Sequence, residues 1–197
     1  GEGIRKITQF VLQRTMESLI QWRKQMPSLH VAVNVSPRVL LDHQFPITLG
    51  QMLAHYQLPG EAIILELTES TLLVDPIRAV EIINVLANMG INVEIDDFGT
   101  GYSSLAYLKS LPISALKIDR SFIVNMQNGE RDIALVAAMI DVAHQLGMKA
   151  IAEGVETEAE RAQLIALNCD QIQGYFYGKP MSAAQATLFA SKRPEAT

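Results

Sequence analysis

The sequence predicts an α/β fold with parallel strands, of the (β/α)8 barrel type. Two observations support this prediction. Short β-branched runs alternate with longer segments whose apolar residues recur about every 3.6 positions, and polar residues stand where the apolar runs end. Alternating strands and helices imply parallel strands joined by right-handed crossovers. In a barrel the carboxyl ends of the strands meet at one mouth, where the active sites of that fold lie.

Six strands are expected along the chain. Their ranges are Val31–Val35, Ala62–Leu67, Ile91–Ile95, Ala115–Ile118, Lys149–Ala152 and Asp170–Gln173. A complete barrel has eight strands, so the count leaves this barrel two strands short.

Helices are expected between and around these strands. Their ranges are Ile4–Met26, Pro46–Gln57, Pro76–Met89, Asp132–Leu146, Glu156–Leu167 and Ser182–Ala190. Gly90 and Gly147 stand where two helices should end, and Thr157 with Glu160 forms a capping-box pattern.

A doubly wound open sheet is the competing architecture. That fold would suggest a glycine-rich phosphate loop after an early strand, but neither GxGxxG nor GxxxxGK[ST] occurs in the chain. The barrel also explains why polar residues recur at the strand ends, so it is favoured.

Composition excludes several classes of function. Lys and Arg total 16, and Asp and Glu total 21. The resulting net charge of −5 argues against binding to duplex nucleic acid, whose phosphates attract positive charge. The longest apolar run, Ile133–Ile140, is far shorter than the roughly 20 residues that span a bilayer. Cys169 is the single cysteine, which fits a reducing compartment. We expect one cytoplasmic globular domain over residues 1–197, with no membrane contact from this segment, although a longer parent protein can be membrane-anchored.

The polar residues at the strand ends form the candidate site. They are Asn34, Glu66, Asp96, Asp97, Lys117, Asp119, Glu153 and Gln173. Carboxylates that share one depression repel one another, and bound cations would relieve this repulsion. Oxygen ligands favour Mg²⁺, Mn²⁺ or Ca²⁺, whereas the four scattered histidines show no zinc-site spacing.

The adjacent pair Asp96 and Asp97 is informative. Asp96 should face the barrel lumen, and Asp97 should begin a loop and turn toward a second ion. Two metals that share a bridging carboxylate are suited to phosphodiester hydrolysis. Other interpretations stay open, because a strand-end carboxylate is often a helix N-cap, and Lys117 in an apolar strand is also explained by a structural salt bridge.

Six blocks of the sequence carry a resemblance to a known family. They are Val33–Pro37 (VNVSP), Glu66–Ser70 (ELTES), Asp96–Leu105 (DDFGTGYSSL), Leu116–Asp119 (LKID), Ala152–Glu156 (AEGVE) and Gln173–Tyr175 (QGY). In this order and spacing the blocks resemble the EAL family of cyclic di-GMP phosphodiesterases, and the resemblance covers essentially the whole chain.

The resemblance implies a barrel that opens cyclic di-GMP to linear pGpG with two Mg²⁺ or Mn²⁺ ions. Asn34, Glu66 and Asp96 would hold the first metal. Asp96 would bridge to the second metal, which Asp97 also binds.

The resemblance also implies roles for residues around the metals. Lys117 would orient the attacking water, and Glu153 would ligate a metal or assist proton removal. Glu69 would anchor the DDFGTGYSSL loop. The full set of substrate-binding or supporting residues is Ser36, Pro37, Asp119, Gln173, Glu69 and Glu156.

Two features depart from the family pattern. The Glu-Ala-Leu motif, whose Glu is a metal ligand, is absent, so we expect an EAL domain that is incomplete at its N-terminus and weakly active or inactive in this form. Glu94 stands where the family more often has a small or apolar residue. By strand alternation Glu94 shares a face with Asp96, where a buried salt bridge is one expectation for it.

Alternative functions remain open at this point. The chain can be a non-catalytic cyclic di-GMP receptor or a protein-interaction module, or it can hydrolyse another nucleotide. Two exposed sheet edges would favour a homodimer or a higher oligomer.

Overall fold

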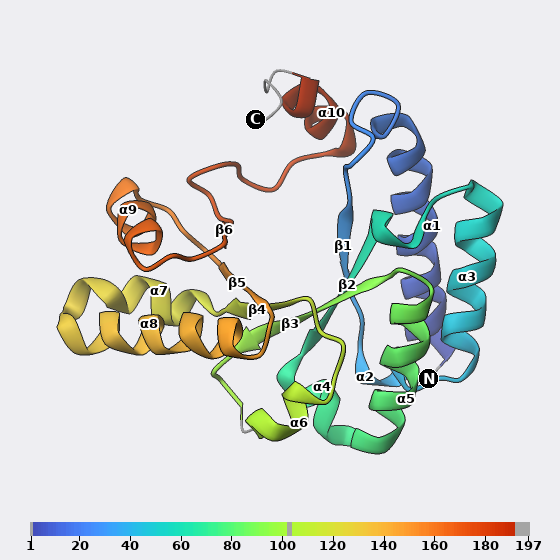
Figure 1. Cartoon of the computed structure of the whole chain (residues 1–197). Coiled ribbons are helices and arrows are strands. Elements are labelled where there is room, and N and C mark those ends of the chain that lie inside the picture. The colour runs from blue at the N-terminus through green and yellow to red at the C-terminus, as the bar shows by residue number, and fades with distance from the viewer. Residues whose placement is uncertain (1, 102–103, 192–197) are drawn as a thin grey trace.

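A single parallel sheet forms the centre of the structure. The computed structural model describes residues 2–101 and 104–191, and in this part six strands pair in chain order as one curled, open half-barrel (Figure 1). The strands are β1 (Val31–Asn34), β2 (Ile63–Thr68), β3 (Asn92–Phe98), β4 (Ala115–Ile118), β5 (Lys149–Ala152) and β6 (Gln171–Ile172). The predicted six parallel strands of an α/β fold are therefore confirmed.

Helices flank the sheet. They are α1 (Glu2–Trp22), α2 (Pro37–Leu40), α3 (Gln44–Tyr56), α4 (Glu69–Val74), α5 (Pro76–Asn88), α6 (Leu105–Lys109), α7 (Arg120–Asn125), α8 (Glu130–Gln145), α9 (Glu158–Ala166) and α10 (Ala183–Ser191). Short 3-10 turns lie at Gly60–Ala62 and Met126–Asn128. The six longer helices were predicted. The short helices α2, α4, α6 and α7 were missed, because four to six residues hardly show a 3.6-residue period.

Helix ends follow the local sequence signals. Gly90 and Gly147 adopt φ values of 79° and 74° directly after α5 and α8, as predicted for helix-terminating glycines. The capping box at α9 is also confirmed: the Glu160 backbone N–H donates to Thr157 Oγ1, and the Thr157 N–H donates to Glu160 Oε2. The first helix ends at Trp22 and not at the predicted Met26, because the turn to β1 begins there.

The sheet separates an apolar face from a polar face. Side chains alternate along each strand, and Val33, Leu65 and Leu116 belong to the buried core beneath the helices. The register places Asn34 beside Glu66 and Glu66 beside Glu94, so the polar residues share the opposite, concave face. The fold thus collects the polar strand residues on one surface.

The sheet has open edges within the described residues. There, β1 pairs with β2 alone and β6 pairs with β5 alone. The self-association expected from such edges stays a prediction. None of the described helices is both long and apolar enough to cross a bilayer.

Replacing Thr157 with Ala should lower the free energy of unfolding by about 1 kcal/mol, because the Glu160 backbone N–H loses its acceptor. Thr157→Ser keeps the hydroxyl and should unfold like the wild type. Urea denaturation followed by circular dichroism measures both variants, and an equal loss in both would contradict the capping role.

Candidate active site

An irregularity in β3 brings two consecutive carboxylates together. Neighbouring residues of a regular strand point to opposite faces. Here the register between β3 and β4 shifts between Ile95 and Phe98, and Asp97 adopts a φ of 55°, which Asp tolerates better than most residues. As a result Asp96, Asp97 and Glu153 each offer a carboxylate oxygen within 4.8 Å of the others. β3 ends at Phe98 and not at the predicted Ile95. Asp97 therefore lies within the strand and not in the loop that was predicted to begin there.

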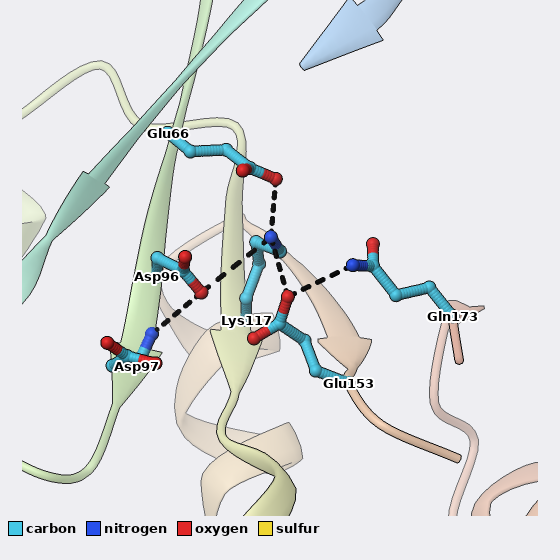
Figure 2. Close-up of polar contacts among 6 residues, drawn as sticks. All are labelled: Glu66, Asp96, Asp97, Lys117, Glu153 and Gln173. Atoms are coloured by element: carbon cyan, nitrogen blue, oxygen red, sulfur yellow. Dashed lines mark hydrogen bonds and ion pairs between the residues drawn. The ribbon is translucent and has the colours of Figure 1, made fainter. Parts of the chain in front are cut away.

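Lys117 lies among the carboxylates, in the middle of β4. Its side chain is only 2% exposed, and its ammonium donates to Glu66 Oε1 and to Glu153 Oε1, the latter at 2.6 Å (Figure 2). Asp96 Oδ1 lies 3.7 Å from the same nitrogen. One ammonium therefore joins carboxylates that come from β2, from β3 and from the segment after β5.

Burial and charge shift the acidities of these groups. Burial disfavours the charged ammonium, but the hydrogen bonds to Glu153 and Glu66 prevail and raise the pKa of Lys117 above its ordinary value. Burial raises the pKa of Glu153 to about 7, against the lowering effect of Lys117. Burial, followed by Asp96 and Asp119, raises the pKa of Asp97. Four carboxyl groups, those of Glu66, Asp96, Asp97 and Glu153, thus lie around one ammonium.

The remaining strand-end residues surround this cluster. Gln173 Nε2 donates to Glu153 Oε1 at 3.0 Å (Figure 2). Asn34, Ser36 and Pro37 line a cavity of about 340 Å³ together with Glu66. Within the described residues, Ser36 Oγ is buried there without a hydrogen-bond partner.

Three of the predicted site residues, Asp119, Glu69 and Glu156, make contacts with the segments that surround the carboxylate cluster. Asp119 caps α7, since its Oδ1 accepts the Ser121 backbone N–H at 2.9 Å. Glu69 Oε2 accepts the Gly101 N–H at 3.1 Å, which is the contact that an anchor of the loop after β3 requires.

Glu156, the third of these residues, pairs with Arg120 at 2.7 Å. Both side chains line a cavity of about 560 Å³, which Glu153, Gln173 and Lys179 also border. Arg120 was not predicted from the sequence as a site residue. Its position directly after the LKID block, at the end of a strand, was the signal that could have found it.

The donor set fits a hard cation. Among residues 2–101 and 104–191, the side chains close enough together to hold a metal ion are Asp96, Asp97 and Glu153, all of them carboxylates. Carboxylate oxygens are the ligands that Mg²⁺ and Mn²⁺ prefer. This donor set suits a hard divalent cation better than Zn²⁺, whose sites mostly use His or Cys ligands.

Comparison with known proteins agrees with this arrangement. The family model described as "EAL domain" matches residues 2–180 of the chain. The chain belongs to the EAL domain family. Cyclic di-GMP phosphodiesterase PdeF of Escherichia coli strain K12 is 37% identical over 174 residues, which cover 88% of this chain and 23% of PdeF.

A second relative also carries a name that includes cyclic di-GMP phosphodiesterase. The bifunctional diguanylate cyclase/cyclic di-GMP phosphodiesterase MucR of Pseudomonas aeruginosa is 42% identical over 156 residues, which cover 79% of this chain and 23% of MucR. This EAL chain therefore spans about a quarter of the length of these curated relatives.

Solved EAL structures share the fold. The PaMucR phosphodiesterase in complex with c-di-GMP superposes with a TM-score of 0.88 at 38% identity, covering 92% of this chain and 74% of that one. The EAL domain of Mycobacterium smegmatis DcpA gives a TM-score of 0.89 at 34% identity, covering 95% and 85%.

Replacing Lys117 with Met should lower the unfolding free energy of the metal-free protein by about 3–5 kcal/mol, because the buried carboxylates lose their counter-charge. Guanidinium denaturation in the presence of a chelator measures this loss. Lys109→Met, at an exposed position on α6, is the matched control. If both variants unfold at the same denaturant concentration, Lys117 does not compensate the cluster.

Proposed function

We propose that this EAL domain hydrolyses one phosphodiester bond of cyclic di-GMP and releases linear pGpG, using two divalent cations. The observation that carries the proposal is the convergence of Asp96, Asp97 and Glu153 beside the buried ammonium of Lys117. Support also comes from relatives named as cyclic di-GMP phosphodiesterases and from a homologous structure in complex with c-di-GMP.

The chain offers ligands for both cations. Asn34, Glu66 and Asp96 would hold the first, and Asp96 with Asp97 would hold the second, with Glu153 at the same cluster. Mg²⁺ and Mn²⁺ fit these oxygen donors. When bound, the cations offset the negative charge that develops on the phosphate and make the attacking water more acidic.

Protein groups position the water and move its proton. Lys117 keeps its proton, because the hydrogen bonds to Glu153 and Glu66 raise its pKa, so it acts as a fixed donor that orients water. The raised pKa of Glu153, about 7, suits a carboxylate that accepts a proton near neutral pH. The water oxygen bonds to phosphorus, the bond from phosphorus to the ribose 3′ oxygen breaks, and that oxygen takes up a proton. The product keeps a 5′ phosphate, as pGpG does.

The cavity beside Glu153 offers room for the rest of the nucleotide. Arg120 and Lys179 bring positive charge to its wall, and Tyr175 brings an aromatic ring. Cationic side chains suit the second phosphate of cyclic di-GMP, and an aromatic ring suits a purine base.

Single-turnover hydrolysis tests the proposal. With protein in excess over cyclic di-GMP and with Mn²⁺ present, chromatography should detect pGpG. Asp97→Asn should slow its formation by about 100-fold or more, because the metal ligands act as a unit. Asp141→Asn, an exposed substitution on α8, should leave the rate unchanged.

A non-catalytic cyclic di-GMP receptor is the second candidate. It is favoured by the ion pairs of Lys117 with Glu66 and Glu153, which compensate buried carboxylates without a cation. Equilibrium dialysis that shows tight nucleotide binding, combined with no pGpG in the single-turnover assay, would contradict the phosphodiesterase and support the receptor.

A further inference from the structure

Glu94 lies on the concave face of the sheet, one layer below Asp96. It belongs to β3, its residue is 8% exposed, and its register neighbour on β2 is Glu66. Glu66 in turn neighbours Asn34 on β1. Three adjacent parallel strands, each about 4.8 Å from the next, therefore carry a row of oxygen-bearing side chains at one level.

The carboxylate of Glu94 lacks a partner in the described part of the chain. No hydrogen bond or ion pair reaches it there, so the salt bridge that was one expectation for Glu94 is not found. Its neighbour Glu66 binds Lys117 through Oε1, which leaves Oε2 for another group. Glu94 is a nine-tenths buried residue whose carboxylate has no partner among the described residues, and a bound cation would compensate its charge.

The charges that face Glu94 do not supply full compensation. Glu66 and Asp96 are negative, and Lys117 is already shared among Glu66, Asp96 and Glu153. Lys149 is exposed on β5, with Ala115 of β4 between it and Glu94 in the register. Burial, followed by Glu66, raises the pKa of Glu94, against the lowering effects of Lys117 and Lys149.

We infer that Glu94 is a further ligand of the first of the two proposed cations, Mg²⁺ or Mn²⁺, beside Asn34 and Glu66 on the concave face. The inference rests on the proposed function, because that function already uses Asn34 and Glu66 as ligands of the first cation. Neither the family resemblance nor the geometry of the three-carboxylate cluster assigns a role to Glu94. Two carboxylates and one amide oxygen supply the hard ligands that these ions prefer, and water completes their coordination.

Calorimetric titration of the metal-free full chain with Mn²⁺ tests this assignment without measuring catalysis. The wild type should show two binding events. Glu94→Gln should weaken one of them by about tenfold or more and leave the other unchanged, since one ligand is lost. Asp97→Asn should weaken the other event. Glu81→Gln, which removes an exposed carboxylate from α5, should titrate like the wild type, and thermal unfolding checks that all variants are folded.

A conservative variant separates ligation from a through-space effect of charge. Glu94→Asp keeps the charge but shortens the side chain by one methylene, so it should bind Mn²⁺ as weakly as Glu94→Gln. Wild-type affinity in Glu94→Asp, or an unchanged titration in Glu94→Gln, would overturn the inference. If one of these two results is found and the protein still forms pGpG with Mn²⁺, the inference about Glu94 is wrong but the proposed phosphodiesterase activity stands. A wild type that binds no Mn²⁺ contradicts both.

Discussion

The buried ammonium of Lys117 is the interaction on which the rest of the site depends. It comes from the middle of β4 and binds carboxylates of β2 and of the segment after β5, with Asp96 of β3 close by. Without a positive charge here, these partly buried side chains would repel one another. Lys117 therefore sets the spacing of the acidic groups, and that spacing defines where a cation can lie.

The backbone of β3 supplies the second constraint. A regular strand would turn Asp97 away from Asp96, and the shifted register with the left-handed φ of Asp97 turns it back. The parallel sheet then adds Glu153 from the segment after β5, because the carboxyl ends of parallel strands meet at one edge. Irregular backbone in one strand and regular pairing in the others together make the carboxylate cluster.

Much of this arrangement could be predicted from the sequence. The strand periodicity and the polar strand ends were enough to place Glu66, Asp96, Lys117 and Glu153 together, since parallel strands leave few alternatives. The extension of β3 to Phe98 could not be foreseen, because a bulge depends on pairing with β4 and leaves no distinct pattern in the chain. Glu94 could be recognised from the sequence as a departure from the family pattern on the face of Asp96, but not as a residue without a partner. Its lack of a partner depends on where Lys117 and Lys149 lie in three dimensions.

Asp119 shows the limit of interpretation from spacing. Its position after a strand fits both a site carboxylate and a helix cap, and the structure shows the capping contact with Ser121. Asp119 nevertheless contributes to the raised pKa of Asp97, so a cap can also act on the neighbouring site through its charge.

A diffraction experiment at the manganese absorption edge tests the central claim, that these carboxylates are spaced to hold divalent cations. Crystals soaked in Mn²⁺ should show an anomalous peak between Asp96, Asp97 and Glu153. Crystals that show no anomalous peak at this face, with the pairs from Lys117 to Glu66 and Glu153 unchanged, would contradict the account and leave the cluster as a structural ion network.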